Sequence, residues 1–114
     1  MPLNRRRTPR CLCDLEAEVL GPRGTLRGAV KNLSTGGLFF TGKDLLGVGQ
    51  SADFEFTIDG QKLRATGEVR FQQRDPSGAA SMGVKFIRLE PAALAIIQAF
   101  VDRSPKAPDP TEEP

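Results

Sequence analysis

The stretch ADFEFTIDGQKLRATGEVRF, residues 52–71, decides the fold class. In its first half, apolar and polar residues alternate with the two-residue period of a strand that buries one face. Asp59-Gly60 follows and is a strong signal for a two-residue β-hairpin turn. Residues 62–71 then return as a long strand, in which Gly67 predicts a bulge or a barrel corner.

The same strand pattern extends in both directions along the chain. Further short strands are expected at residues 13–19, 25–31, 38–41 and 82–89, with turns or loops between them. Six closely spaced strands predict a mainly all-β domain, either a sandwich or a barrel. A small closed barrel would leave no strand edge exposed.

One helix is expected after the last strand. Pro91 suits its first turn, and AALAIIQAFVDR continues it to residue 103. Its apolar residues do not fit one narrow stripe, whereas a helix that lies on a barrel buries one face. Either loops cover the excess, or the helix makes a second contact, with a partner protein or with another copy as a homodimer.

The length of 114 residues predicts one domain. Residues 1–10 are expected to form a flexible, arginine-rich arm, because Pro9 forbids a regular helix there. Residues 11–103 are expected to hold the barrel and its helix. Residues 104–114, rich in proline and acid, are expected to be disordered.

Cys11 and Cys13 are expected to be reduced thiols in a cytoplasmic protein. Two cysteines without a histidine supply too few ligands for a structural zinc site, so no metal is expected. No apolar run at the N-terminus predicts a secretory signal. The longest apolar stretch, residues 92–101, contains Gln98 and is too short to cross a bilayer, so no membrane insertion is expected.

No enzymatic activity is expected. The chain has no histidine and no recognisable nucleophile–base pair, so the sequence offers no catalytic residues. The formal net charge is only +2, but four arginines precede the first acidic residue. Charge concentrated in this way predicts a local anion site rather than a long stripe along a nucleic acid.

Two short motifs carry the functional signal. RRRTPR, residues 5–10, supplies Arg5-Arg6-x-x-x-Arg10, and NLSTGG, residues 32–37, supplies Asn32-x-Ser34-x-x-Gly37. Each motif alone is common, the first as a solvated tail and the second as an ordinary turn. Together, in this order, they resemble the PilZ domain family, and MGVKF at residues 82–86 is similar to a strand common in that family. The resemblance covers about residues 4 to 103 and implies a six-stranded antiparallel β-barrel with one C-terminal α-helix.

PilZ domains typically bind cyclic di-GMP, so the resemblance implies this dinucleotide as ligand and no cofactor. Arg5, Arg6 and Arg10 match the arginine motif and are expected to hold phosphate and guanine. A guanidinium can grip phosphate oxygens or a guanine edge with two hydrogen bonds, and it can stack on a purine. Arg7 falls on a variable position and is expected to be solvated.

The second motif is expected to meet the other guanine edge. Asn32 and Ser34 share one face of an extended segment and can offer oxygens to guanine N–H groups. Many family members carry aspartate where this chain has Asn32, which implies a weaker contact. Gly36 and Gly37 would let the backbone turn sharply beside the ligand. Phe71 falls where several members carry a tryptophan close to the ligand, and an ordinary wall or core position explains it equally well.

The resemblance implies a receptor that signals to a separate effector protein. We expect the arm to be loose without ligand and to fold across the barrel near Asn32 when an anion neutralises it. One alternative is a PilZ-like protein-interaction module that does not bind cyclic di-GMP. Another is a small barrel that binds RNA or single-stranded DNA, but such barrels interleave aromatic and basic residues, and this chain has no tryptophan or tyrosine. No DNA or RNA partner is therefore expected.

Overall fold

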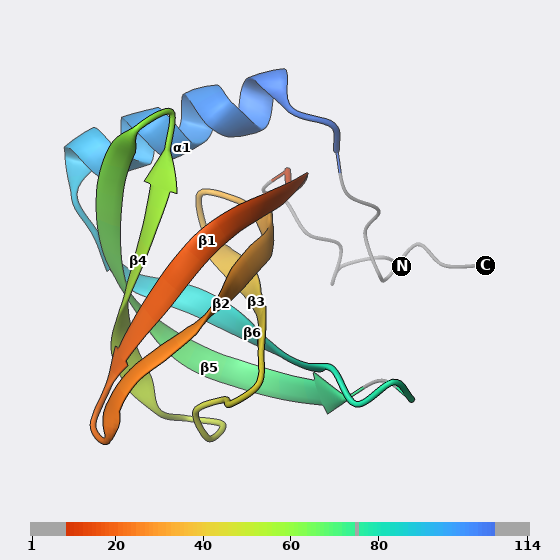
Figure 1. The fold of residues 1–114 in the computed structure, drawn as a ribbon. Coiled ribbons are helices and arrows are strands. Elements are labelled where there is room, and N and C mark those ends of the chain that lie inside the picture. Colours follow the sequence, from red (N-terminus) through yellow and green to blue (C-terminus); the bar gives the residue numbers. More distant parts are fainter. Residues whose placement is uncertain (1–8, 75, 107–114) are drawn as a thin grey trace, which may run out of the picture.

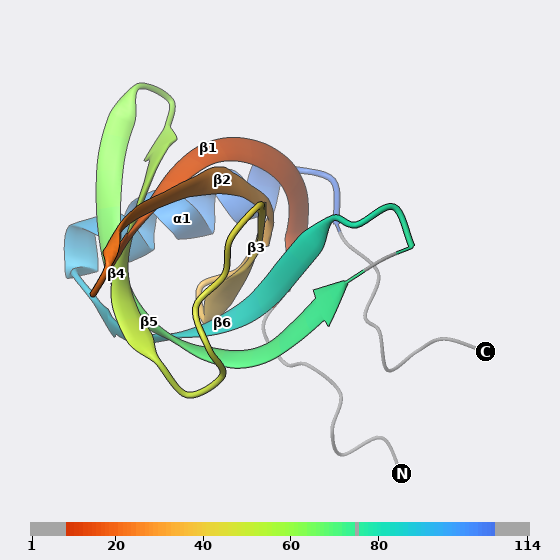
Figure 2. The same cartoon turned by 60° about the horizontal axis from the view of Figure 1, so that its bottom comes forward.

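The computed structural model describes residues 9–74 and 76–106. Within these ranges the chain forms six strands and one helix: β1 (Cys11–Gly21), β2 (Gly24–Leu33), β3 (Gly37–Gly42), β4 (Ser51–Ile58), β5 (Gln61–Arg74), β6 (Ala80–Leu89) and α1 (Pro91–Arg103). The strands close into an antiparallel barrel in the order β1-β2-β3-β6-β5-β4 (Figures 1 and 2). The predicted six-stranded barrel with a C-terminal helix is confirmed.

The β4–β5 hairpin has the turn that its sequence predicts. Ile58 pairs with Gln61, so Asp59 and Gly60 alone make the connection. Both have positive φ, 52° and 81°, which is the geometry of a type I′ turn. The pairing of β5 with β6 shifts register between Thr66 and Gly67, as a bulge or corner near this glycine predicts, but the extra residue is Ile87 of β6 and not Gly67 itself.

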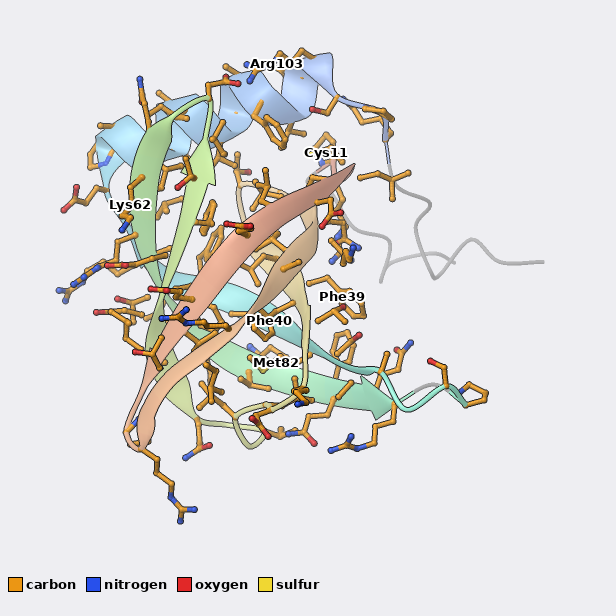
Figure 3. The ribbon with its side chains drawn as sticks, viewed as in Figure 1. Cys11, Phe39, Phe40, Lys62, Met82 and Arg103 are labelled. Atoms are coloured by element: carbon orange, nitrogen blue, oxygen red, sulfur yellow. The ribbon has the colours of Figure 1, made fainter. Side chains whose placement is uncertain are left out.

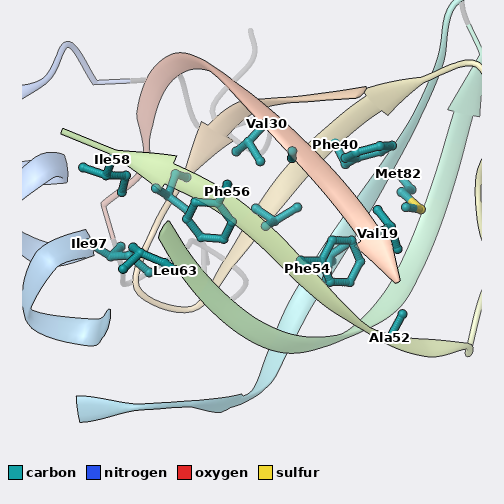
Figure 4. Close-up of a cluster of buried hydrophobic side chains, with 14 of the residues drawn as sticks. Val19, Val30, Phe40, Ala52, Phe54, Phe56, Ile58, Leu63, Met82 and Ile97 are labelled. Carbon is teal, nitrogen blue, oxygen red and sulfur yellow. The ribbon is translucent and has the colours of Figure 1, made fainter. Parts of the chain in front are cut away.

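The barrel interior is filled by apolar side chains from all six strands (Figure 4). Phe40, Phe54 and Phe56 are its largest fully buried members. The rings of Phe40 and Phe54 meet edge to face at 6.5 Å, a favourable aromatic geometry. Because apolar residues alternate into this interior, the opposite face of each strand is left for polar side chains and for binding.

Register shifts break that alternation at several points of the barrel. In β5, Val69 pairs with Val84 and Phe71 with Gly83, so Arg70 is an extra residue. In β2, Val30 pairs with Phe40 and Asn32 with Phe39, so Lys31 is extra. A bulge turns the residues beyond it to the other face of the strand. These two bulges therefore decide what the outer wall presents.

Helix α1 packs across one end of the barrel, over β4 and β5 (Figure 1). Ala93, Ile97 and Val101 lie at a spacing of four residues and are buried, while Ile96 and Phe100 pack partly against the core. Leu94 is the large apolar residue of the helix that stays exposed, at 43%. Packing against the barrel thus covers most of the apolar residues of the helix. The homodimer stays a prediction.

The start of β1 pairs with the segment that follows the helix. Cys11 forms an isolated antiparallel bridge with Lys106, and the amide of Leu12 donates to the carbonyl of Pro105 at 2.8 Å. Figure 3 shows Cys11 near the C-terminal end of α1. The predicted arm and tail lie mostly outside the described residues, and of their described parts Arg10 bonds to Asn32 and Lys106 bridges to Cys11.

Cys11 and Cys13 are free thiols, as predicted. Cys11 is buried, and the thiol of Cys13 donates to the carbonyl of Val30 at 3.3 Å. Across residues 9–74 and 76–106, no helix is long and apolar enough to span a membrane.

Candidate functional site

The two sequence motifs meet on the outer wall of the barrel. A guanidinium nitrogen of Arg10, Nη2, donates to Oδ1 of Asn32 at 2.5 Å. The bulge at Lys31 makes this contact possible, because it lets Asn32 face outward although Val30, two residues earlier, is buried. Arg5 and Arg6 lie outside the described residues, so Arg10 alone represents the arginine motif here.

Ser34 holds the turn that joins β2 to β3. Its side chain is 1% exposed, and its Oγ accepts hydrogen bonds from the amides of Gly36 at 3.0 Å and Gly37 at 3.1 Å. The amide of Ser34 donates to the carbonyl of Gly37 at 2.9 Å, which closes the loop. A hydroxyl that accepts from two backbone amides fixes the shape of the site, so Ser34 acts first on the backbone of this turn.

The two glycines of the motif differ in their physical role. Neither has positive φ, so the sharp turn expected of them does not use the left-handed region. Gly37 lies tightly against β6, where a Cβ atom would sit 2.1 Å from the carbonyl oxygen of Val84. At Gly36 a Cβ would have 3.8 Å to its nearest neighbour, the Ser34 Oγ. Gly37 is therefore required by close strand packing, and Gly36 leaves open space at the cavity.

Phe71 lies on the outer wall and not in the core. Its ring covers Gly83, where a Cβ would come within 2.1 Å of a ring carbon, and it contacts the Phe39 ring at 6.1 Å between centroids. Figure 3 shows Phe39 on the outside of the barrel and Phe40 toward the inside. Phe71 is still 43% exposed, so one apolar ring face is free for contact.

These elements surround a cavity of about 400 Å³. Arg10, Ser34, Gly36, Gly37 and Phe71 line it, so five of the predicted site residues come together there. Asn32 adjoins it through its bond to Arg10. Arg70 and Lys85 also line the cavity, and the sequence motifs did not point to them. Arg70 could have been identified as a basic residue at a bulge, next to an exposed aromatic ring. The bulge, however, cannot be predicted from the alternation of apolar and polar residues.

The chemistry of this cavity suits a flat, anionic ligand. Three cations line it, and among the described lining residues there is no carboxylate. The Phe71 ring offers a stacking surface, and the guanidinium groups can form paired hydrogen bonds to phosphate oxygens or to a base edge. The turn amides of Gly36 and Gly37 are engaged by Ser34, so they are not free donors for an anion.

Two other hollows of similar volume do not show this combination. One, of about 400 Å³, is lined by Glu16, Glu18 and Glu55 together with Arg27 and Lys62, and both cations pair with a glutamate. The other, of about 450 Å³, lies between the loops at residues 21–24 and 44–50.

Neither thiol is activated, and no metal-ligand cluster occurs in the part of the chain that the structure describes. Burial raises the pKa of Cys13 to about 12, with the neighbouring Cys11 and Asp14 adding to the shift. Burial also raises the pKa of Cys11. A thiol is a nucleophile only as the thiolate, so both cysteines are inert at neutral pH.

Comparison with known proteins points to one family. The model of the PilZ domain matches residues 4–103. The inhibitor of motility MotI/DgrA from Bacillus subtilis shares the fold with a TM-score of 0.78 and 19% identity, over 87% of this chain and 50% of that one. The PilZ domain of YcgR from Escherichia coli, solved with c-di-GMP, gives a TM-score of 0.69 and 15% identity, over 86% of this chain and 89% of that one.

YcgR from Escherichia coli, solved in complex with c-di-GMP, gives a TM-score of 0.73 and 17% identity, over 86% of this chain and 45% of that chain. This chain therefore spans about half the length of MotI/DgrA and of that YcgR chain. At these identities the structural likeness shows the fold alone. No functionally curated protein matches the sequence.

Proposed function

Because the chain belongs to the PilZ domain family, whose members are binding modules, we propose that it is a receptor for cyclic di-GMP. The observation that supports this most is the meeting of both motifs in one cavity, where Arg10 and Ser34 are lining residues and Arg10 donates to Asn32. The ligand brings two phosphodiesters and two guanines. The cavity brings three cations and an exposed aromatic ring, which are the matching groups.

In this proposal the arm closes the site. Arg10 is already bound to Asn32 without ligand, so the arm is anchored at its base. Arg5 and Arg6 then reach over the ligand and bind guanine and phosphate. Ordering of residues 4–8 creates or blocks a surface that a separate effector protein reads. The ordering costs free energy, which lowers the affinity relative to a preformed site.

Asn32 has a specific part in this mechanism. Its single carbonyl oxygen accepts from Arg10 in the ligand-free protein. To accept from a guanine N–H as well, the oxygen must use its second lone pair or release Arg10. An aspartate would offer two oxygens and a charge. The chain therefore binds the ligand more weakly than its Asn32→Asp variant does.

Calorimetric titration of cyclic di-GMP into the full chain tests the proposal. Saturable binding is expected for the wild type and is expected to disappear in the Arg6→Ala/Arg10→Ala variant. The matched control is Arg74→Ala/Arg88→Ala, which removes two exposed arginines that do not line the cavity. GTP and cyclic di-AMP should not displace the ligand. A folded wild type that takes up no cyclic di-GMP would overturn the assignment.

Hydrogen exchange tests the arm mechanism separately. Amides of residues 4–8 are expected to exchange more slowly when cyclic di-GMP is bound. Equal exchange with and without ligand would show that ordering of the arm is not the signal.

The second candidate function is a protein-interaction module that does not bind the dinucleotide. Two observations favour it: the uncharged Asn32 already accepts a hydrogen bond from Arg10, and the Ser34 hydroxyl already accepts from the turn amides. Under this reading the exposed Leu94 of α1 belongs to the partner surface. The calorimetric titration separates the two functions.

A further inference from the structure

Two cations of the cavity belong to neither motif. Arg70 comes from β5 and Lys85 from the adjacent strand β6, so both stand on the barrel wall and not on the arm. Both side chains are exposed. Together with Arg10 they give the cavity three positive charges, two of which come from the strands of the wall.

The bulge at Arg70 explains why the wall presents this residue beside an aromatic ring. Val69 is fully buried, so regular alternation would turn Arg70 outward and Phe71 back into the core. Instead, Arg70 and Phe71 together oppose the single residue Gly83, and both face outward. Bulges are enriched next to binding sites, where they redirect a side chain. One extra residue thus places a guanidinium next to a stacking surface.

The charges of Arg70 and Lys85 are not neutralised by the wall itself. On the opposite side of the barrel, Arg27 pairs with Glu18, and Arg64 with Glu55. Arg70 and Lys85 form no ion pair within the described ranges, although Glu68 lies directly opposite Lys85 in the register. Like charges that line one hollow raise its potential and attract an anion.

We propose that Arg70 and Lys85 bind one phosphodiester of the ligand on the barrel wall, while Arg10 binds the other. This assignment rests on the proposed function, because it divides the two phosphates of a cyclic dinucleotide between two groups of cations. Arg70 and Lys85 lie on strands β5 and β6 of the barrel wall, so the ligand meets their charges on the wall itself.

Single charge removals test the assignment in the full-length protein. Arg70→Gln and Lys85→Gln should each weaken cyclic di-GMP binding about 10-fold, the size expected for the loss of a charge-assisted hydrogen bond to phosphate. Arg74→Gln and Arg88→Gln are matched controls on the same two strands, outside the cavity, and should bind like the wild type. Unchanged melting temperatures would show that all four variants fold. Wild-type affinity in Arg70→Gln and Lys85→Gln would overturn the assignment.

A double-mutant cycle tests the division of the phosphates. If Arg10 and Arg70 bind different phosphodiesters, the losses in Arg10→Gln and Arg70→Gln should add in the double variant. Strong non-additivity would mean that both residues hold the same phosphate and would refute the division.

A second probe distinguishes failure of this assignment from failure of the proposed function. If the wild type does not bind cyclic di-GMP, inorganic pyrophosphate is titrated while NMR follows the backbone amides of Arg70 and Lys85. Shifts at these amides that vanish in Arg70→Gln/Lys85→Gln would keep the wall as an anion site although the receptor function has failed. No shifts would end both proposals.

Discussion

At the scale of single residues, the direction of Phe71 sets the floor of the cavity. Its ring lies over Gly83 and against Phe39, with one face open. Gly83 is needed for this placement, because any side chain there would occupy the position of the ring. A ring fixed in this way is preorganised for stacking, so little side-chain entropy is lost when a base binds.

Replacing Phe71 tests this role. Phe71→Ala should weaken cyclic di-GMP binding by about 1–3 kcal/mol, the usual value of one base–aromatic stack. Ile87→Ala is the matched control, because Ile87 is another exposed apolar residue beside a register shift, 58% exposed, and does not line the cavity. Calorimetry measures the affinity of both variants for cyclic di-GMP. Equal affinities for the two variants would show that Phe71 only covers the wall.

Because of Cys13, the stability of the fold should decrease with pH in the alkaline range. Its pKa is raised to about 12 in the folded protein, from 9.0 for an ordinary cysteine. Between these values the unfolded chain loses the thiol proton while the folded chain keeps it. The free energy of unfolding should therefore fall as pH rises from about 9 toward 12.

Urea unfolding of the wild type and of Cys13→Ala at pH 8 and pH 10.5 measures this effect. The variant should lose less stability than the wild type between the two pH values. The absence of tyrosine removes one competing group from this pH range. Parallel losses in both proteins would contradict the raised pKa.

At the scale of elements, the approach of β3 to β6 depends on Gly37. Gly37→Ala would push a methyl group into the carbonyl of Val84, and backbone cannot move aside cheaply. We expect a loss of a few kcal/mol, about 2–4, which is typical of overpacking next to backbone. Gly36→Ala, one residue away with open space, should cost less than about 1 kcal/mol. Chemical denaturation compares the two, and similar losses would show that the contact is not limiting.

The helix allows a similar comparison. Ile97 is fully buried against the barrel, so Ile97→Ala should cost about 2–5 kcal/mol of stability. Leu94→Ala should leave stability nearly unchanged, because the side chain is 43% exposed. If α1 mediates a homodimer, Leu94→Ala should also weaken the association in sedimentation equilibrium. A monomeric wild type would remove the homodimer prediction.

The elements also show what the sequence can and cannot predict. Asp59-Gly60 dictates its own turn, and the alternation of residues 52–58 dictates a half-buried strand, so the hairpin and the six-stranded fold are predictable from local rules. Bulges are not, because an extra residue becomes visible only when the partner strand is known. For this reason the outward position of Phe71 could not be read from the sequence.

The motif residues show the same limit. Asn32, Ser34 and Arg10 were recognised by their spacing, and the structure brings them together. The spacing did not reveal that the Ser34 hydroxyl accepts hydrogen bonds from the amides of its own turn. Local hydrogen bonds of this kind depend on the exact path of the loop, which tertiary pairing of β3 with β6 determines.

At the scale of the whole molecule, the six described strands close into a barrel, so among them there is no free edge that a partner could extend. A partner protein would therefore have to recognise side chains of the outer wall, the helix, or the chain segments that flank the barrel. The cavity lies on the wall formed by β3, β5 and β6, and Arg10 links that wall to the start of β1.

The bridge between Cys11 and Lys106 brings the two flanking segments to one point of the barrel. Residue 114 could therefore be joined to residue 1 and the chain reopened at the exposed turn between Pro22 and Arg23, without changing any strand partner. In such a circular permutant the linking segment has both ends tethered to the barrel, which lowers its conformational entropy. Under the proposed function, this variant should bind cyclic di-GMP at a lower concentration than the wild type does.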